Sequence, residues 1–164
     1  MLDISHALKN PGQIYPLKAE VELPDMEIMG ENLSFENACV EGELLGAGEN
    51  VSVKGMVRAD VLAHCARCLS PVRYPAETKV NETFVRAENA GADSDAYLIV
   101  GTEIGLEDLA KDAIVLDLPM RFLCSEDCLG LCPKCGGNRN ERSCTCLEGD
   151  DDNPFAAIRD LFSK

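Results

Sequence analysis

The 164-residue chain has no tryptophan, and aromatic residues make up only 5% of it. Its hydrophobic fraction of 46% is nonetheless ordinary for a globular protein, so we expect a core of aliphatic side chains. No apolar run approaches the ~20 residues needed to cross a bilayer, so we expect no membrane contact. The N-terminus also lacks the pattern of a secretory signal. These absences predict a cytoplasmic protein, in which thiols stay reduced and structural disulfides are not expected.

Basic residues are scarce: 15 Lys and Arg stand against 29 Asp and Glu, for a net charge of −14. This balance argues against a large phosphate-binding face. Two segments are not acidic, 54–86 and 119–147, and they hold all but one of the nine cysteines. Their basic residues either neutralise cysteine thiolates, which we favour, or form a limited contact with RNA. These residues are Arg67, Arg73, Arg121, Lys134, Arg139 and Arg142.

No catalytic set is visible, and we predict no catalytic residue. The sequence contains neither a glycine-rich phosphate loop nor a nucleophile elbow. Of the two histidines, His6 is expected at the surface. His64 adjoins Cys65 and could be a spare metal ligand, but neighbouring side chains of a strand point in opposite directions. We therefore expect His64 to point away from any site at Cys65.

Alternating apolar residues predict three strands in the first half of the chain, over 38–45, 51–61 and 72–84. The last two flank "CARCLSP", which places Cys65 and Cys68 at the tip of a β-hairpin. Pro75 indicates that the third strand lies at a sheet edge or near a bend. A mobile acidic loop is expected over 86–96, and a short strand over 97–100.

From residue 106 the period changes to that of a helix, with an apolar stripe that ends near Pro119. A second helix is expected after Asn153, with Pro154 in its first turn. The predicted fold class is α+β: an antiparallel, mainly β sheet with one covering helix and a loop-rich C-terminal lobe stapled by zinc. We expect a β-rich domain over 1–118 and a cysteine-rich lobe with the C-terminal helix over 119–164, packed as one unit.

The most specific motif is "CPKCGGNRNERSCTC", in which two closely spaced cysteine pairs lie within 15 residues. A C-P-x-C-G turn directs backbone N–H groups at sulfur, and four thiolates make a closed tetrahedral Zn²⁺ site. This group, called site 2 below, comprises Cys132, Cys135, Cys144 and Cys146. Two incomplete pairs remain and together supply four ligands for a second zinc ion. This group, called site 1, comprises Cys65, Cys68, Cys124 and Cys128.

Other cysteine chemistry fits less well. An iron–sulfur cluster in place of zinc remains an alternative, although the spacing departs from the ferredoxin run. A thioredoxin-like dithiol at "CARC" would need a strand–helix context, whereas strands flank it here. Free buried cysteines are a further alternative, for which this spacing would be a coincidence. Cys39 has no partner in the sequence and is expected to be a small buried apolar residue.

The segments "CARCL", "LPMRFLCSEDCLGLCPKCGGNRNERSCTC" and "NPFAAIRDLF" together resemble the YceD family of large ribosomal RNA subunit accumulation proteins. The resemblance runs in order from "LDISHALKNPG" to the final segment. It implies a cytosolic factor that supports accumulation or maturation of 23S rRNA. It also implies that site 1 is the core site of the family and that site 2 is an addition to it.

The resulting hypothesis is a non-enzymatic factor for 23S rRNA accumulation and large-subunit assembly, with two structural zinc ions. Its expected partner is a ribosomal or assembly protein of the large subunit, with any rRNA contact limited to the basic residues named above. Two alternatives stay open: a metal-dependent rRNA-processing enzyme with an open metal site, and a protein that delivers zinc to a ribosomal protein.

Overall fold

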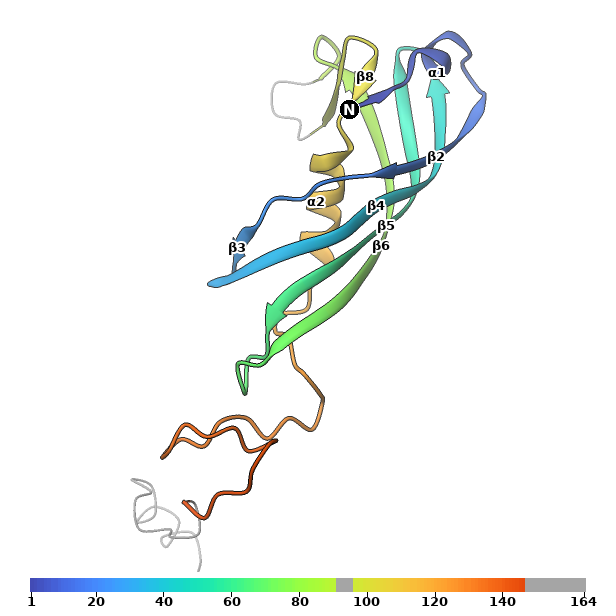
Figure 1. Ribbon diagram of the computed structural model, residues 1–164. Coiled ribbons are helices and arrows are strands. Elements are labelled where there is room, and N and C mark those ends of the chain that lie inside the picture. The colour runs from blue at the N-terminus through green and yellow to red at the C-terminus, as the bar shows by residue number, and fades with distance from the viewer. Residues whose placement is uncertain (91–95, 147–164) are drawn as a thin grey trace, which may run out of the picture.

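The computed structural model describes residues 1–90 and 96–146. Three long strands, β4 (Glu31–Ala47), β5 (Asn50–His64) and β6 (Pro71–Arg86), form an antiparallel meander that curls along the length of the molecule (Figure 1). The shorter elements are β1 (Leu2–Asp3), α1 (Ser5–Lys9), β2 (Ile14–Glu20), β3 (Met26–Ile28), β7 (Tyr97–Val100), β8 (Glu103–Ile104) and α2 (Leu106–Asp117). The sheet order is β1-β8-β7-β6-β5-β4-β2, and β3 pairs with β4.

The predicted alternation in β5 is confirmed. One face of this strand carries five side chains that are at most 3% exposed: Val51, Val53, Val57, Ala59 and Val61. The other face is polar, and Arg58 there donates to Glu41 and Glu77 on the two neighbouring strands, at 2.8 and 2.6 Å. The sheet therefore has one apolar face, which another element must shield from water, and one polar face on which ion pairs join neighbouring strands.

Helix α2 covers the apolar face, as predicted from its period (Figure 1). Its stripe buries Leu106, Leu109, Ala110 and Ile114 against the sheet. Acidic residues in the first turn stabilise the helix, because their negative charge lies near the positive end of the helix dipole. Leu118 leaves the helix in an extended conformation (φ −63°, ψ 139°), because the following Pro119 disfavours helical backbone before it.

Strand β4 is longer than the predicted span of 38–45. Its register against β5 shifts between Glu36 and Cys39, where Asn37 has a positive φ of 53°. This bulge breaks the period-two pattern on which the prediction rested. Cys39 lies at this irregularity and is half-buried, so the expectation of a buried residue was wrong. The sheet is antiparallel except between β6 and β7, which run parallel.

Beyond α2 the β5–β6 hairpin continues to a tip that meets the C-terminal segment (Figure 1). Over 119–146 the structure contains no helix or named strand, only a bridge between Leu131 and Asn138. The lobe is thus loop-rich, as expected. Within the described residues, β7 reaches only the end of β6, at Phe84–Arg86, so Pro75 lies at the sheet edge, as its position in the sequence indicated. The boundary at residue 118 between a β-rich domain and the cysteine-rich lobe stays a prediction.

The predicted helix after Asn153 lies outside the described residues, as does part of the predicted acidic loop, over 91–95. Within the described parts, neither helix is long and apolar enough to cross a membrane.

Candidate metal centre

The hairpin tip forms a tight turn around Cys65. The N–H of Leu69 donates to the carbonyl of Cys65 at 2.9 Å, and the N–H of Cys65 donates to the carbonyl of Ser70 at 2.8 Å. Leu69 has a positive φ of 61°, which closes the turn. Cys65 and Cys68 are both buried, at 0% and 5% exposure. The turn therefore holds two thiols side by side at the end of the long strands.

The turn at Cys132 repeats this hydrogen bonding position by position. The N–H of Gly136 donates to the carbonyl of Cys132 at 2.8 Å, and the N–H of Cys132 donates to the carbonyl of Gly137 at 2.8 Å. Gly136 occupies the place of Leu69 and has a φ of 68°. The two turns, over 65–70 and 132–137, thus have the same backbone hydrogen bonds although they share little sequence, and each is called a cysteine knuckle below. Glycine adopts this backbone without strain, whereas leucine does not.

In each of the two knuckles, backbone N–H groups stabilise the thiolate of the first cysteine. Burial acts to raise the pKa of Cys65, but hydrogen bonds from the backbone of Cys124, Arg67 and Cys68 bring that pKa down to about 6. Hydrogen bonds from the backbone of Cys135 and Lys134 likewise lower the pKa of Cys132 to about 6. In each knuckle the donors are two and three residues beyond the first cysteine. A thiolate is the metal-binding form of cysteine, so both knuckles are prepared for a cation.

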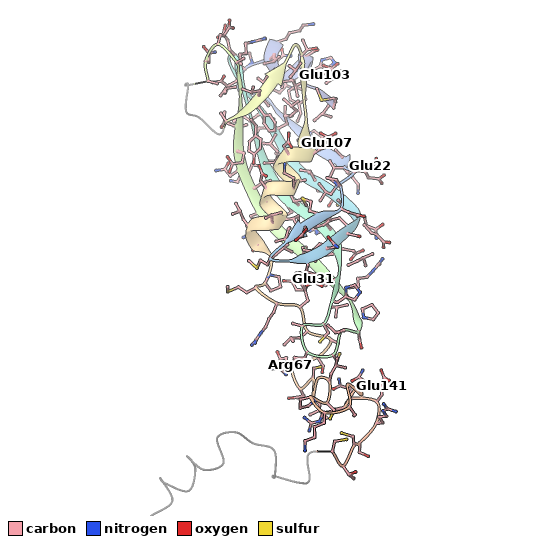
Figure 2. The ribbon with its side chains drawn as sticks, turned by 90° about the vertical axis from the view of Figure 1, so that its left-hand side faces the viewer. Glu22, Glu31, Arg67, Glu103, Glu107 and Glu141 are labelled. Atoms are coloured by element: carbon pink, nitrogen blue, oxygen red, sulfur yellow. The ribbon has the colours of Figure 1, made fainter. Side chains whose placement is uncertain are left out.

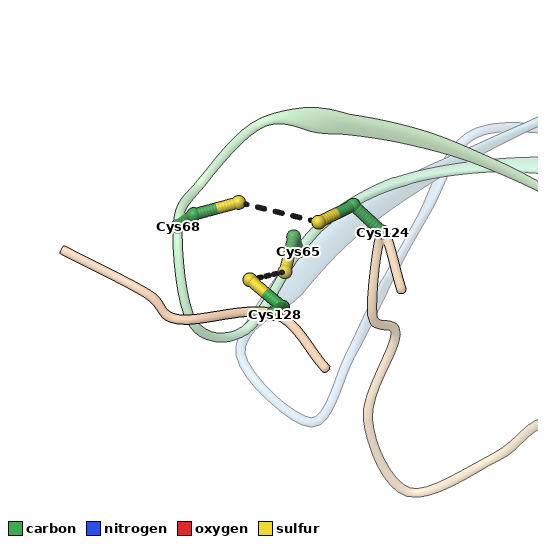
Figure 3. Close-up of side chains that lie close together, drawn as sticks. All are labelled: Cys65, Cys68, Cys124 and Cys128. Carbon is green, nitrogen blue, oxygen red and sulfur yellow. Dashed lines mark hydrogen bonds between the residues drawn. The ribbon is translucent and has the colours of Figure 1, made fainter. Parts of the chain in front are cut away.

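Site 1 is completed by two cysteines that follow α2 in the chain (Figure 3). The Sγ atoms of Cys65 and Cys128 lie 3.7 Å apart, and those of Cys68 and Cys124 lie 3.6 Å apart. All four sulfurs lie within 4.8 Å of one another. The structure therefore brings together the two pairs that the sequence analysis assigned to one site.

These separations fit a tetrahedral zinc ion. Zn–S bonds of about 2.3 Å place the sulfurs of a tetrahedron about 3.8 Å apart, whereas a disulfide would bring two sulfurs to about 2.05 Å. Hydrogen bonding with Cys128 and Cys68 raises the pKa of Cys124 to about 12. Four thiols that share so small a volume cannot all ionise without a cation between them, and a divalent ion offsets this repulsion. The donor set fits zinc in chemistry and in spacing.

Arg67 links the hairpin tip to the segment that carries Cys128. Its guanidinium donates to the carbonyl of Cys128 at 2.9 Å and to that of Glu126 at 3.1 Å. Figure 2 places Arg67 where the hairpin tip meets the lobe that carries Glu141. The N–H of the neighbouring Ala66 donates to the carbonyl of Phe122 at 2.9 Å. The hairpin and the segment after α2 are therefore joined by backbone contacts as well as by sulfur.

Site 2 is built within the lobe alone and is more open. Its four sulfurs also lie within 4.8 Å of one another. Cys132 is buried, Cys144 and Cys146 are half-buried, and Cys135 is exposed. Hydrogen bonding with Cys135 raises the pKa of Cys146 to about 11, so the thiols of this group also hinder one another's ionisation. Both groups can thus bind a metal ion, and the assignment of these residues as ligands stays a prediction.

The basic residues named from the sequence lie in different settings. Arg67 is engaged at site 1, and Arg73 pairs with Glu36 and with Asp60 on the polar face of the sheet. Lys134 and Arg142 are exposed on the lobe. Their contact with RNA stays a prediction.

His64 lies beside Glu31, with its Nδ1 at 3.8 Å from the carboxylate and its backbone N–H donating to the same group. Its ring is exposed and is not one of the side chains grouped with the sulfurs of site 1. The sequence analysis missed Asn140, whose side chain donates to the sulfur of Cys128 at 3.3 Å. Neither its type nor its spacing marks it as part of a metal site.

Comparison with known proteins places this arrangement in a family. The model of the large ribosomal RNA subunit accumulation protein YceD matches residues 53–162. An uncharacterized protein of Mycobacterium tuberculosis is 31% identical over 155 residues, covering 86% of this chain and 74% of the relative. The uncharacterized protein YlbN of Bacillus subtilis is 26% identical over 129 residues, or 77% of this chain and 75% of YlbN.

A plant relative carries the family name. The large ribosomal RNA subunit accumulation protein YCED homolog 1, chloroplastic, of Arabidopsis thaliana is 30% identical over 59 residues, which are 36% of this chain and 18% of that protein. No solved structure matches the chain significantly. The matched region of the family model contains both groups of four cysteines. The chain belongs to the YceD family.

Proposed function

We propose that sites 1 and 2 each hold a structural Zn²⁺ ion. The observation that carries this proposal is the pair of knuckles, in each of which backbone N–H groups stabilise the first thiolate of a group of four sulfurs. Four protein ligands leave no coordination position for water or substrate, and such sites are structural. The residues that would hold the ions are those assigned to the two sites from the sequence.

We further propose that the protein is a non-enzymatic cytoplasmic factor that supports 23S rRNA accumulation and assembly of the large ribosomal subunit. Membership of the YceD family supports this function. The net charge of −14 favours a basic ribosomal or assembly protein as the direct partner. Contact with rRNA would be limited to basic residues of the lobe, such as Lys134 and Arg142, both of which are exposed.

Depletion of the protein tests this function. Sucrose-gradient profiles of depleted cells are expected to show fewer large subunits, and the level of 23S rRNA is expected to fall. Wild-type protein should restore both, whereas Cys68→Ser, which removes a buried ligand of site 1, should not. Cys39→Ser serves as the matched control, because Cys39 lies on β4 away from both groups of sulfurs. Unchanged subunit peaks and rRNA after depletion would contradict the proposal.

Zinc delivery is a second candidate, and the exposure of site 2 favours it. Three of its four cysteines are not fully buried, whereas three of the four at site 1 are. A delivery site must release its ion to a competing ligand while the rest of the protein stays folded. The test is a competition with a weak chelator, followed separately for the two sites. Loss of the site 2 ion with transfer to an apo ribosomal protein would support delivery, and retention of both ions would exclude it.

A further inference from the structure

Asn140 belongs to the loop of site 2, yet its side chain contacts site 1. It lies between Cys135 and Cys144 in the sequence. Its Nδ2 donates to the Sγ of Cys128 at 3.3 Å, and its Oδ1 accepts the N–H of Leu129 at 2.8 Å. One amide thus contacts the last ligand of site 1 and the residue that follows it.

Asn138 fixes the orientation of this amide. The Oδ1 of Asn138 accepts from the backbone N–H of Asn140 at 3.0 Å and from its Nδ2 at 2.8 Å. Both N–H groups of the Asn140 amide are therefore used, one by Asn138 and one by sulfur. The reverse orientation would place Oδ1 against the thiolate and Nδ2 against the donor of Leu129, so only the observed one satisfies all partners.

The loop that carries Asn140 is held at both of its ends by site 2. Cys132 and Cys135 precede it, and Cys144 and Cys146 follow it. Along the loop, Asn138 forms a bridge with Leu131, and the N–H of Arg139 donates to the carbonyl of Gly130 at 3.0 Å. Closure of site 2 around an ion would therefore also fix the position of Asn140.

An N–H donor to a metal-bound thiolate orients the sulfur and favours its charged form. We propose that Asn140 is a positioning residue through which ion binding at site 2 strengthens ion binding at site 1. The inference rests on the proposed metal binding at both sites. Since such coupling is reciprocal, an ion at site 1 strengthens site 2 by the same factor.

Cadmium NMR of the full chain loaded with Cd²⁺ tests the coupling, because each four-sulfur site gives its own resonance. Cys68→Ser removes one ligand of site 1 and so identifies its resonance. Competition with EDTA, followed at each resonance, gives the affinity of each site. Asn140→Asp keeps the acceptor for Leu129 and the size of the side chain but lacks the donor to sulfur. Ser143→Ala, at an exposed position of the same loop, is the matched control.

Asn140→Asp is expected to lower the Cd²⁺ affinity of site 1 by about 10- to 100-fold. It should also shift the site 1 resonance, since the electron density on a bound sulfur changes when its hydrogen bond is lost. A role confined to loop folding would leave that shift unchanged in the loaded protein. Cys144→Ser with Cys146→Ser should lower site 1 affinity similarly, and adding Asn140→Asp to that pair should cost little more, because both act through one contact. Ser143→Ala should match wild type.

The failure of this inference differs from the failure of the proposed metal binding. If wild-type protein gives no cadmium resonance, metal binding itself is refuted. If both resonances appear but Asn140→Asp, or the loss of site 2, leaves the affinity of site 1 as in wild type, the coupling is refuted and metal binding stands.

Discussion

Removal of the metal is expected to unfold the lobe and to leave the sheet intact. The main core is formed by the sheet, α1 and α2, and among the described residues after α2 it includes only Phe122 as a buried member. The small cluster at site 1 consists of cysteines, with Leu123 and Leu131 only partly buried against it. Within the described residues, the lobe thus lacks an apolar core large enough to offset the entropy lost on ordering it.

The magnitude follows from what the ions contribute. A structural zinc site contributes on the order of 10 kcal/mol to the free energy of unfolding of the segment that binds it. Amides also exchange whenever the whole protein unfolds, so the free energy of protection cannot exceed the global stability, which is about 5–15 kcal/mol for most proteins. Loss of the ions should therefore reduce amide protection in the lobe by between about four and seven powers of ten. The amides to follow are those of Leu131, Cys132 and Gly136, whose N–H groups donate within the lobe or to the hairpin tip.

Hydrogen exchange monitored by NMR, with and without a chelator, measures this loss residue by residue. The amides of Val53 and Val57 in the middle of β5 serve as internal controls and should keep their protection. Slow exchange of Gly136 and Leu131 in metal-free protein would refute the reasoning, since packing and hydrogen bonds alone would then hold the lobe. Simultaneous loss of protection at Val53 would also refute it, because the ions would then support the whole fold.

Three further predictions concern single residues. Leu69→Gly should raise the free energy of unfolding of the metal-loaded protein by about 1 kcal/mol, because leucine is strained at positive φ, whereas Gly136→Ala should lower it by a similar amount; urea denaturation measures both. Phe122→Ala should cost about 3–5 kcal/mol in the same assay, because the ring is 6% exposed, while Met120→Ala, at an 86% exposed residue, should cost less than about 0.5 kcal/mol. Burial and the nearby Asp112 carboxylate raise the pKa of Tyr97 to about 12 from 10.0, so its contribution to stability is complete below pH 10 and is lost as the pH rises to about 12. Tyr97→Phe should therefore lose less stability than wild type over that range, and equal losses in pH-dependent denaturation would exclude this role.

The long, regular elements were predictable from the sequence because each has a continuous apolar face. The alternation over 51–61 and the helical stripe from Leu106 correspond to β5 and α2. The shorter strands β1, β3 and β8 have two or three residues each, too few to show a period. The parallel pairing of β6 with β7 depends on a return of the chain that no local pattern records.

The grouping of the cysteines was also predictable, because two incomplete pairs can form one tetrahedron only together. The structure brings these pairs within reach of one another. The contacts that support them were not predictable. The donation from Asn140 to Cys128 and that from Arg67 to the carbonyl of Cys128 both depend on how the loops cross in space. The sequence marked Arg67 only as a basic residue near the cysteines, and it did not mark Asn140 at all.

The distribution of site 1 over two distant segments has a consequence for synthesis. Cys68 leaves the ribosome 56 residues ahead of Cys124. At about 5–20 residues per second, the hairpin thiols wait roughly 3 to 11 seconds for their partners. During that interval only two of the four sulfurs of site 1 have been translated. The proposed ion at site 1 can be enclosed only after α2 has been translated, so sheet and helix can pack first, and metal capture would then complete the fold.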